Sequence, residues 1–223
     1  MDNQEIINVI DANMSRYQMI SDKVLSVIQR DSTIKKLTHS IKTRFKDISH
    51  VDEKITRKNA EARTKSTELI TPENVLSRIT DIAGIRLIHL HMGQFVEIHQ
   101  ALMSYVQDGE LFLHEEPKAY SWDPEYVNVF NSLSINAEQK ESFYTSVHYL
   151  FKAREDNQFT CELQVRTLFE EAWGEIDHIV NYPNKSESLA VKEQLKVLAR
   201  LVSTGSRLSE SIFKLHASTQ DKN

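Results

Sequence analysis

The sequence is poor in cysteine, glycine and proline. Its 223 residues contain one cysteine, Cys161, so the chain can form neither an internal disulfide nor a zinc site built on thiolates, and a reducing compartment is expected. Five glycines and four prolines make up about 4% of the chain, against roughly 12% in average proteins. This scarcity disfavours a turn-rich β-sandwich and favours long helices.

The sequence also lacks a membrane span and a signal peptide. No apolar run approaches the roughly 18 residues that a transmembrane helix needs. The first five residues include Asp2 and Glu5, where a signal peptide would carry basic residues. We therefore expect a soluble, cytoplasmic protein with no membrane partner.

A basic segment lies within a chain whose net charge is −5. Residues 35–65 contain ten Lys or Arg and four Asp or Glu, a net charge of +6, whereas residues 108–142 contain eight acids and two lysines. A local basic stretch in an acidic protein indicates an anionic ligand bound at one place, and a solvated basic surface is the alternative.

Hydrophobic periodicity switches between helical and strand spacing along the chain. Helices are predicted at 6–28, 51–69, 94–106, 125–133 and 167–180, with a last long helix after Pro183 that Ser186 or Ser188 caps and a frayed tail from about Ser218. Strands are predicted at 37–46, 82–90, 111–114, 143–151 and 159–166, the last two as a hairpin, with a loop after 114. This order predicts an α+β fold with long N- and C-terminal helices. We divide it into an N-terminal helical segment (1–36), a central domain (37–183) and a C-terminal helix and tail (184–223).

The strand predicted at 159–166 places chemical groups on one face. Period two directs residues 161, 163 and 165 toward the core, and Glu162, Gln164 and Arg166 toward the other face at intervals of about 6.6 Å. A carboxylate, an amide and a guanidinium in a row can bind a metal, a hydroxyl and a phosphate. An exposed sheet face with an ion pair is the alternative interpretation.

Matching groups occur on other predicted strands. Asp81 stands before the apolar strand that contains Arg86, and an acid there together with Glu162 suits Mg²⁺ held by carboxylates and phosphates. Tyr144 and His148 share a strand face and offer an aromatic platform and a polar group to a nucleotide base and its sugar. Lys42, Arg44 and Lys46 form a cationic strand face that can neutralise a polyphosphate.

Three segments together resemble the synthetase domain of the RelA/SpoT family. They are Asp-Ile-Ala-Gly-Ile-Arg (81–86), Tyr-Thr-Ser-Val-His (144–148) and Glu-Leu-Gln-Val-Arg-Thr (162–167), and the resemblance extends over about residues 40–183. Members of this family move pyrophosphate from ATP to the 3′-hydroxyl of GDP or GTP, which yields the alarmones (p)ppGpp. The resemblance therefore implies a nucleotidyltransferase-like mixed sheet flanked by helices, ATP and GDP or GTP as ligands, and Mg²⁺ as cofactor.

The resemblance also implies roles for single residues. Asp81 and Glu162 correspond to the residues that hold Mg²⁺, and Glu162 to the one that draws the proton from the attacking hydroxyl. Tyr144 corresponds to a tyrosine that stacks on the acceptor guanine. His148, Gln164 and Arg166 are assigned with it to the acceptor side, and Arg44, Lys46, Lys54 and Arg86 to the ATP side.

The chain departs from the family around Tyr144. Family members commonly have the run Pro-Lys-x-Asn-Gly-Tyr-Arg-Ser-Leu-His, whereas residues 142–148 are Ser-Phe-Tyr-Thr-Ser-Val-His, without the Asn, the Gly and the Arg. The identity of the acceptor is therefore left open. The chain contains no His-Asp dipeptide, so we expect no metal-dependent alarmone hydrolysis.

Two other functions are compatible with the sequence. One is a related pyrophosphokinase that modifies the 3′ end of tRNA, although a net charge of −5 makes a large RNA an awkward partner. The other is a catalytically degenerate relative that binds nucleotides without turnover. A homo-oligomer is compatible with either. We expect Trp173 to be a core residue and Cys161 to be buried and unreactive.

Overall fold

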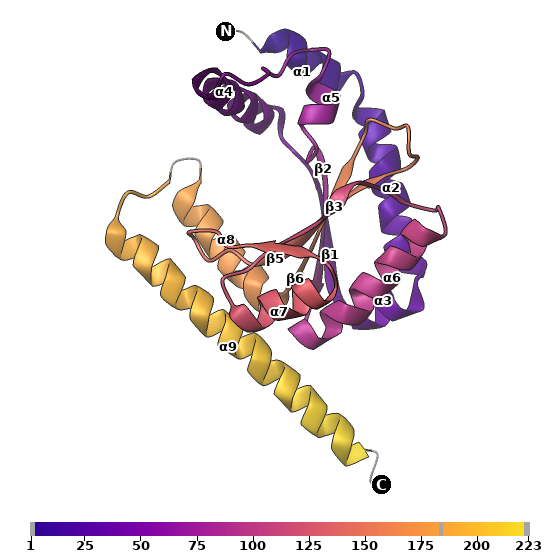
Figure 1. The fold of residues 1–223 in the computed structure, drawn as a ribbon, viewed down its shortest axis with the longest axis vertical. Coiled ribbons are helices and arrows are strands. Elements are labelled where there is room, and N and C mark those ends of the chain that lie inside the picture. The colour runs from indigo at the N-terminus through magenta and orange to yellow at the C-terminus, as the bar shows by residue number, and fades with distance from the viewer. Residues whose placement is uncertain (1–2, 183–184, 221–223) are drawn as a thin grey trace.

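The computed structural model describes residues 3–182 and 185–220 as a six-stranded sheet with helices on both faces (Figure 1). The strands are β1 (Thr38–Phe45), β2 (Ala83–His89), β3 (Phe112–Tyr120), β4 (Asn136–Glu138), β5 (Ser146–Lys152) and β6 (Cys161–Thr167). The helices are α1 (Gln4–Asp11), α2 (Met14–Arg30), α3 (Ser32–Leu37), α4 (Ile48–Lys65), α5 (Val75–Arg78), α6 (Phe95–Gln107), α7 (Pro124–Ser132), α8 (Leu168–Asn181) and α9 (Leu189–Gln220), with a 3₁₀ turn, η1 (Met92–Gln94). The predicted α+β class is confirmed.

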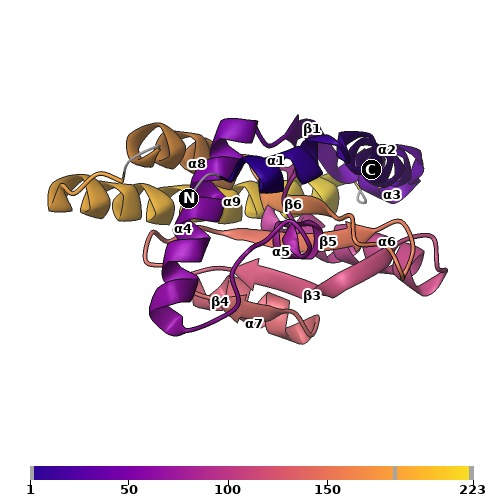
Figure 2. The ribbon, with the colours of Figure 1, turned by 90° about the horizontal axis from the view of Figure 1, so that it is seen from above.

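The strand order is β1-β2-β6-β5-β3-β4, and Figure 2 shows β1, β6, β5 and β3 following one another across the sheet. The pairs β2–β6 and β3–β4 are parallel and the remaining pairs are antiparallel, so the sheet is mixed. Strands β5 and β6 form the hairpin expected from their alternation. Within the described residues, no helix is both long and apolar enough to cross a membrane.

The two faces of the sheet are covered by different helices. Helix α2 packs against β2, β5 and β6 on one face, and α8 packs against β2 and β6 on the other, with α9 lying along α8 (Figure 1). Cys161, Leu163 and Val165 of β6 are buried in the core, as the period-two pattern predicts. Trp173 of α8 is 2% exposed, so its predicted place in the core is confirmed.

The single helix predicted over residues 6–28 is wrong in one respect, because the structure divides it into α1 and α2. At the break, the Asn13 side-chain amide donates to the carbonyl oxygen of Val9 over 2.7 Å. An asparagine that bonds its own backbone in this way competes with helix continuation.

The loop predicted after residue 114 is also wrong, because β3 continues to Tyr120. Proline cannot donate to a sheet ladder, which argued against a strand here. The structure accommodates Pro117 at an irregularity, since the register against β5 shifts between Glu115 and Lys118. The three-residue strand β4 pairs with the end of β3 and was not predicted.

The ends of α8 and α9 follow from short sequence signals. Thr167 and Glu170 form a capping box at the start of α8, in which the Thr167 amide donates to Glu170 Oε2 over 2.7 Å. At the start of α9 the Val191 amide donates to Ser188 Oγ over 3.4 Å, so Ser188 is the cap that the sequence proposed. Helix α9 continues to Gln220, so Ser218 is still helical. The expected boundary at 183/184 and the last three residues of the expected tail lie outside the described residues.

Candidate nucleotide-binding site

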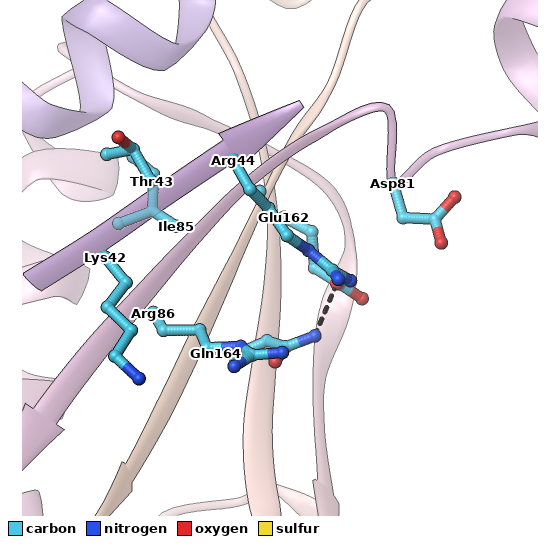
Figure 3. A pocket seen from close by; sticks show the side chains of 9 residues that line it. Lys42, Thr43, Arg44, Asp81, Ile85, Arg86, Glu162 and Gln164 are labelled. Carbon is cyan, nitrogen blue, oxygen red and sulfur yellow. Dashed lines mark hydrogen bonds between the residues drawn. The ribbon is translucent and has the colours of Figure 1, made fainter. Parts of the chain in front are cut away.

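A pocket of about 170 Å³ opens over the α8 side of the sheet (Figure 3). Its walls come from β1, β2 and β6 and from Asp81, two residues before β2. The lining residues are Lys42, Thr43, Arg44, Asp81, Gly84, Ile85, Arg86, Glu162 and Gln164. Five of the residues assigned from the sequence therefore share one pocket.

Parallel pairing of β2 with β6 brings the two candidate catalytic acids to this pocket. Gly84 lies opposite Glu162 in the register, so the start of β2 and the start of β6 are at the same end of the sheet. Asp81 precedes β2 at that end. The negative charge of Asp81 tends to raise the pKa of Glu162, which is the effect of two carboxylates that share a site.

The Asp81 carboxylate is held by two lysines from different elements. Lys46, just after β1, lies 2.7 Å from Oδ2, and Lys54 of α4 lies 2.7 Å from Oδ1. Burial alone would raise the pKa of Asp81, but the charges and hydrogen bonds of the two lysines outweigh burial and lower the pKa to about 2. Asp81 is therefore ionised at any physiological pH.

More positive charge gathers at this end of the pocket than one carboxylate neutralises. Burial lowers the pKa of Lys46, and so do the nearby charges of Lys54 and Arg44, although Asp81 opposes them. Burial and the charge of Lys54 also lower the pKa of Lys58, which the sequence assignments did not include. Lys58 is one helical turn from Lys54, which is the signal that could have identified it. We refer to Lys46, Lys54 and Lys58 as the lysine cluster.

Glu162 is fixed by hydrogen bonds on both of its oxygens. His148 Nδ1 lies 3.0 Å from Oε1, and Gln164 Nε2 donates to Oε2 over 2.7 Å. Tyr144 Oη lies 2.9 Å from His148 Nε2, so a neutral His148 can donate to the carboxylate and accept from the phenol. Burial tends to raise the pKa of Glu162, but the hydrogen bonds from His148 and Gln164 bring it below its usual value.

Tyr144 lies behind His148 and does not line the pocket. Its ring is half-buried and packs near Tyr120 and Trp173, with centroid distances of 5.9 and 6.2 Å. The guanidinium carbon of Arg166 lies 5.6 Å from the ring centroid. A base that stacks on this ring would therefore have these groups as immediate neighbours.

Three cations of the site are held by two acids of α8. Glu171 Oε1 accepts from Lys42 over 2.8 Å and from Arg86 over 3.2 Å, and its Oε2 lies 3.4 Å from Arg166. Glu175 accepts from Arg86 over 2.7 Å. Glu171 is 5% exposed in its side chain, and no sequence pattern indicates its role.

Two arginines of the site lie against glycines of neighbouring elements. The Arg44 side chain lies across Gly84, where an added Cβ would already contact its Cγ at 3.6 Å, and in Figure 3 it extends in the direction of Glu162. Gly174 of α8 leaves room for Arg166, since a Cβ there would lie 2.8 Å from the guanidinium. Arg166 is 4% exposed and also donates to Gln164, so Arg166 lies beneath the pocket wall.

The donor groups of the pocket fit Mg²⁺ only in part. The described residues contain no cluster of three or more His, Cys, Asp or Glu side chains arranged to hold a metal. Mg²⁺ is commonly bound by one or two carboxylates while phosphates and waters complete its shell. Asp81 and Glu162 supply such a pair if a polyphosphate enters beside them.

Comparisons with known proteins identify one matching family and one curated relative. A family model described as "Region found in RelA / SpoT proteins" matches residues 43–187. The chain is 28% identical over 165 residues to GTP pyrophosphokinase YjbM of Bacillus subtilis (strain 168). That match covers 72% of this chain and 66% of the relative, so the chain spans just under two thirds of the relative's length.

Solved structures show the same fold at low identity. A GTP pyrophosphokinase family protein from Streptococcus pneumoniae is 19% identical, with a TM-score of 0.62 over 96% of this chain and 93% of its own. Small alarmone synthetase 1 from Bacillus subtilis is 19% identical, with a TM-score of 0.60 over 99% and 100%. The latter protein has also been solved bound to its product pppGpp and bound to AMPCPP.

Proposed function

The chain belongs to the RelA/SpoT family, and we propose that it transfers pyrophosphate from ATP to the 3′-hydroxyl of GDP or GTP. The observation that carries the proposal is the single pocket in which two acids, distant in sequence, lie beside a concentration of positive charge. The relatives solved with pppGpp and with AMPCPP support a nucleotide ligand of this kind.

The lysine cluster and Arg44 would bind the ATP phosphates. Burial first, and then the neighbouring cations, lower the pKa values of Lys46 and Lys58, so an anion beside them would stabilise their charged forms. A polyphosphate that enters the pocket would be such an anion. Arg86 would contribute from the opposite side, where Glu171 and Glu175 hold it in place.

Asp81 and Glu162 would hold Mg²⁺, which neutralises phosphate charge and lowers the pKa of a nearby hydroxyl when it is bound. Glu162 would accept the proton of the attacking 3′-hydroxyl, and its hydrogen bonds to His148 and Gln164 fix its orientation. The 3′-oxygen would bond to the β-phosphorus of ATP while the bond to the α-phosphate oxygen breaks and AMP leaves. Positioning and charge neutralisation account for catalysis of this type.

The acceptor would lie on the β5 side, where Tyr144 and His148 are. Tyr144 would stack on the guanine, with Gln164 and Arg166 contributing polar contacts below it. A guanine stacked on Tyr144 would adjoin the Arg166 guanidinium and the Tyr120 ring.

A labelling assay with three acceptors tests the proposal. Purified protein is incubated with ATP labelled in its β-phosphate, Mg²⁺, and either GDP, GTP or deacylated tRNA. Label in ppGpp or pppGpp is expected. Label in tRNA alone would favour the tRNA pyrophosphokinase, and no transfer to any acceptor would favour a nucleotide-binding relative without activity.

Two variants provide the controls for this assay. Asp81→Asn and Glu162→Gln should each abolish transfer while the protein still melts cooperatively. Activity close to wild type in either variant would exclude that residue from the mechanism.

A further inference from the structure

Phe143 has a backbone conformation that is rare for a residue with a side chain. Its φ is 65°, in the left-handed region, where a bulky residue is uncommon unless its surroundings hold it there. It lies in the 139–145 loop between β4 and β5, directly before Tyr144. Contacts of its side chain therefore hold Phe143 in this conformation.

The Phe143 ring lies between one ring and two cations. Trp122 stacks on it with a centroid distance of 5.0 Å and an interplanar angle of 15°. The Arg200 guanidinium carbon and Lys196 Nζ lie 5.1 and 5.8 Å from its centroid. Both cations belong to α9, so the ring joins the loop to the C-terminal helix.

Two further contacts tie α9 to the same region. Trp173, whose ring is close to Tyr144, donates from Nε1 to the carbonyl oxygen of Leu195 over 2.8 Å. Ser203 Oγ donates to the buried Asp123 over 2.6 Å, one residue beyond Trp122. Helix α9 therefore contacts Trp173, which lies beside Tyr144, and Asp123, which follows Trp122, although none of its residues lines the pocket.

We propose that Phe143 is a positioning residue whose ring clamps the 139–145 loop to α9, so that the seating of α9 sets the position of Tyr144 and with it the affinity for the acceptor. The identity of the acceptor rests on the proposed function, whereas the clamp itself does not. Helix α9 therefore influences the affinity for the acceptor through the Phe143 ring.

The test compares four variants. Phe143→Asn removes the ring but keeps a residue that tolerates the left-handed conformation without the freedom of glycine. Phe143→Tyr keeps the ring and is its control. The double variant Lys196→Ala/Arg200→Ala removes the cations on α9, and Lys192→Ala, an exposed lysine on the same helix, is its control.

Loss of the stack and cation contacts should raise the KM for GDP or GTP about tenfold in Phe143→Asn, and less in the double variant, since these contacts together are worth on the order of one factor of ten. The KM for ATP should stay within about twofold of wild type, because the lysine cluster is untouched. Both control variants should behave as wild type. Equal losses for ATP and acceptor, or a wild-type acceptor KM in Phe143→Asn, would overturn the clamp.

Hydrogen exchange gives a readout that needs no turnover. Amides of the 139–145 loop should exchange faster in Phe143→Asn and in the double variant than in the two controls. If wild-type protein transfers no pyrophosphate to GDP or GTP, the proposed function fails while this measurement still decides the clamp. Unchanged exchange in both test variants would refute the clamp whatever the activity.

Discussion

Replacing Glu171 with glutamine perturbs the most highly connected acid beneath the pocket. The carboxylate contacts three cations, of which Lys42 is 54%, Arg86 21% and Arg166 4% exposed in their side chains. Glutamine keeps the size and one acceptor oxygen but removes the charge. Arg166 then loses its only acidic partner among the described residues, whereas Arg86 keeps Glu175.

The expected cost follows from these exposures. Removing one partner of a fully buried ion pair costs about 3–5 kcal/mol, whereas an exposed pair contributes about 0–1 kcal/mol. Because Lys42 is half exposed, Arg86 retains a partner and the amide oxygen can still accept, we expect a loss of about 2–3 kcal/mol in the free energy of unfolding. For a chain of this size that is a fall of roughly 5–10 °C in Tm.

Thermal and urea unfolding of Glu171→Gln measure this loss. The matched control is Glu175→Gln, one turn along α8, where the side chain is 49% exposed and the loss should stay below about 1 kcal/mol. If Glu171→Gln unfolds together with wild type, or if the two variants lose equal stability, Glu171 does not hold the cations in the way we describe.

Three other changes have outcomes that follow from the site. Tyr144→Ala should raise the KM for the acceptor far more than the KM for ATP, on the order of tenfold if one base–aromatic stack of about 1–3 kcal/mol is lost. Steady-state kinetics with each substrate varied in turn measure both values, and an equal rise in the two would contradict the stacking role. Lys58→Ala should raise the KM for ATP by roughly fivefold, which corresponds to about 1 kcal/mol. Lys65→Ala, at the exposed end of α4, is the control and should keep the wild-type KM. A wild-type KM for ATP in Lys58→Ala would show that Lys58 does not bind the phosphates. Burial lowers the pKa of His89 from 6.5 to about 4. As the pH falls below 6.5, His89 therefore takes up a proton in the unfolded chain before it does so in the folded chain. The free energy of unfolding should decline from pH 6.5 toward pH 4 by up to about 1.4 kcal/mol per pH unit from this residue. In urea unfolding between pH 6.5 and 5, His89→Gln should show a shallower decline than wild type, and parallel declines would contradict this assignment.

The sequence predicts the chemistry of β6 well because strand alternation is a local property. Glu162 and Gln164 face the pocket and Cys161 faces the core, as period two requires. Burial raises the pKa of the Cys161 thiol to about 12, in agreement with its expected lack of reactivity. The location of Asp81 beside Glu162 could be inferred only through the family resemblance, because it depends on the parallel register of two strands about 80 residues apart.

Other features depend on tertiary contacts that no local pattern reports. Lys46 and Lys54 do not line the pocket themselves, and in the structure they neutralise Asp81 directly. Arg166 alternates correctly onto the polar face but is buried there by α8, which the strand pattern could not indicate. Glu171 resembles any acid in the first turn of a helix, and only the packing of α8 on the sheet reveals its three partners.

The central claim is that Asp81 and Glu162 act together at one nucleotide site. Binding of Mn²⁺ in the presence of AMPCPP, followed by electron paramagnetic resonance, tests it most directly in wild type, Asp81→Asn and Glu162→Gln. We expect wild type to bind Mn²⁺ with the nucleotide and each variant to bind it at least about tenfold more weakly, because each loses one of two carboxylate ligands. Wild-type affinity for Mn²⁺ in both variants would contradict the claim.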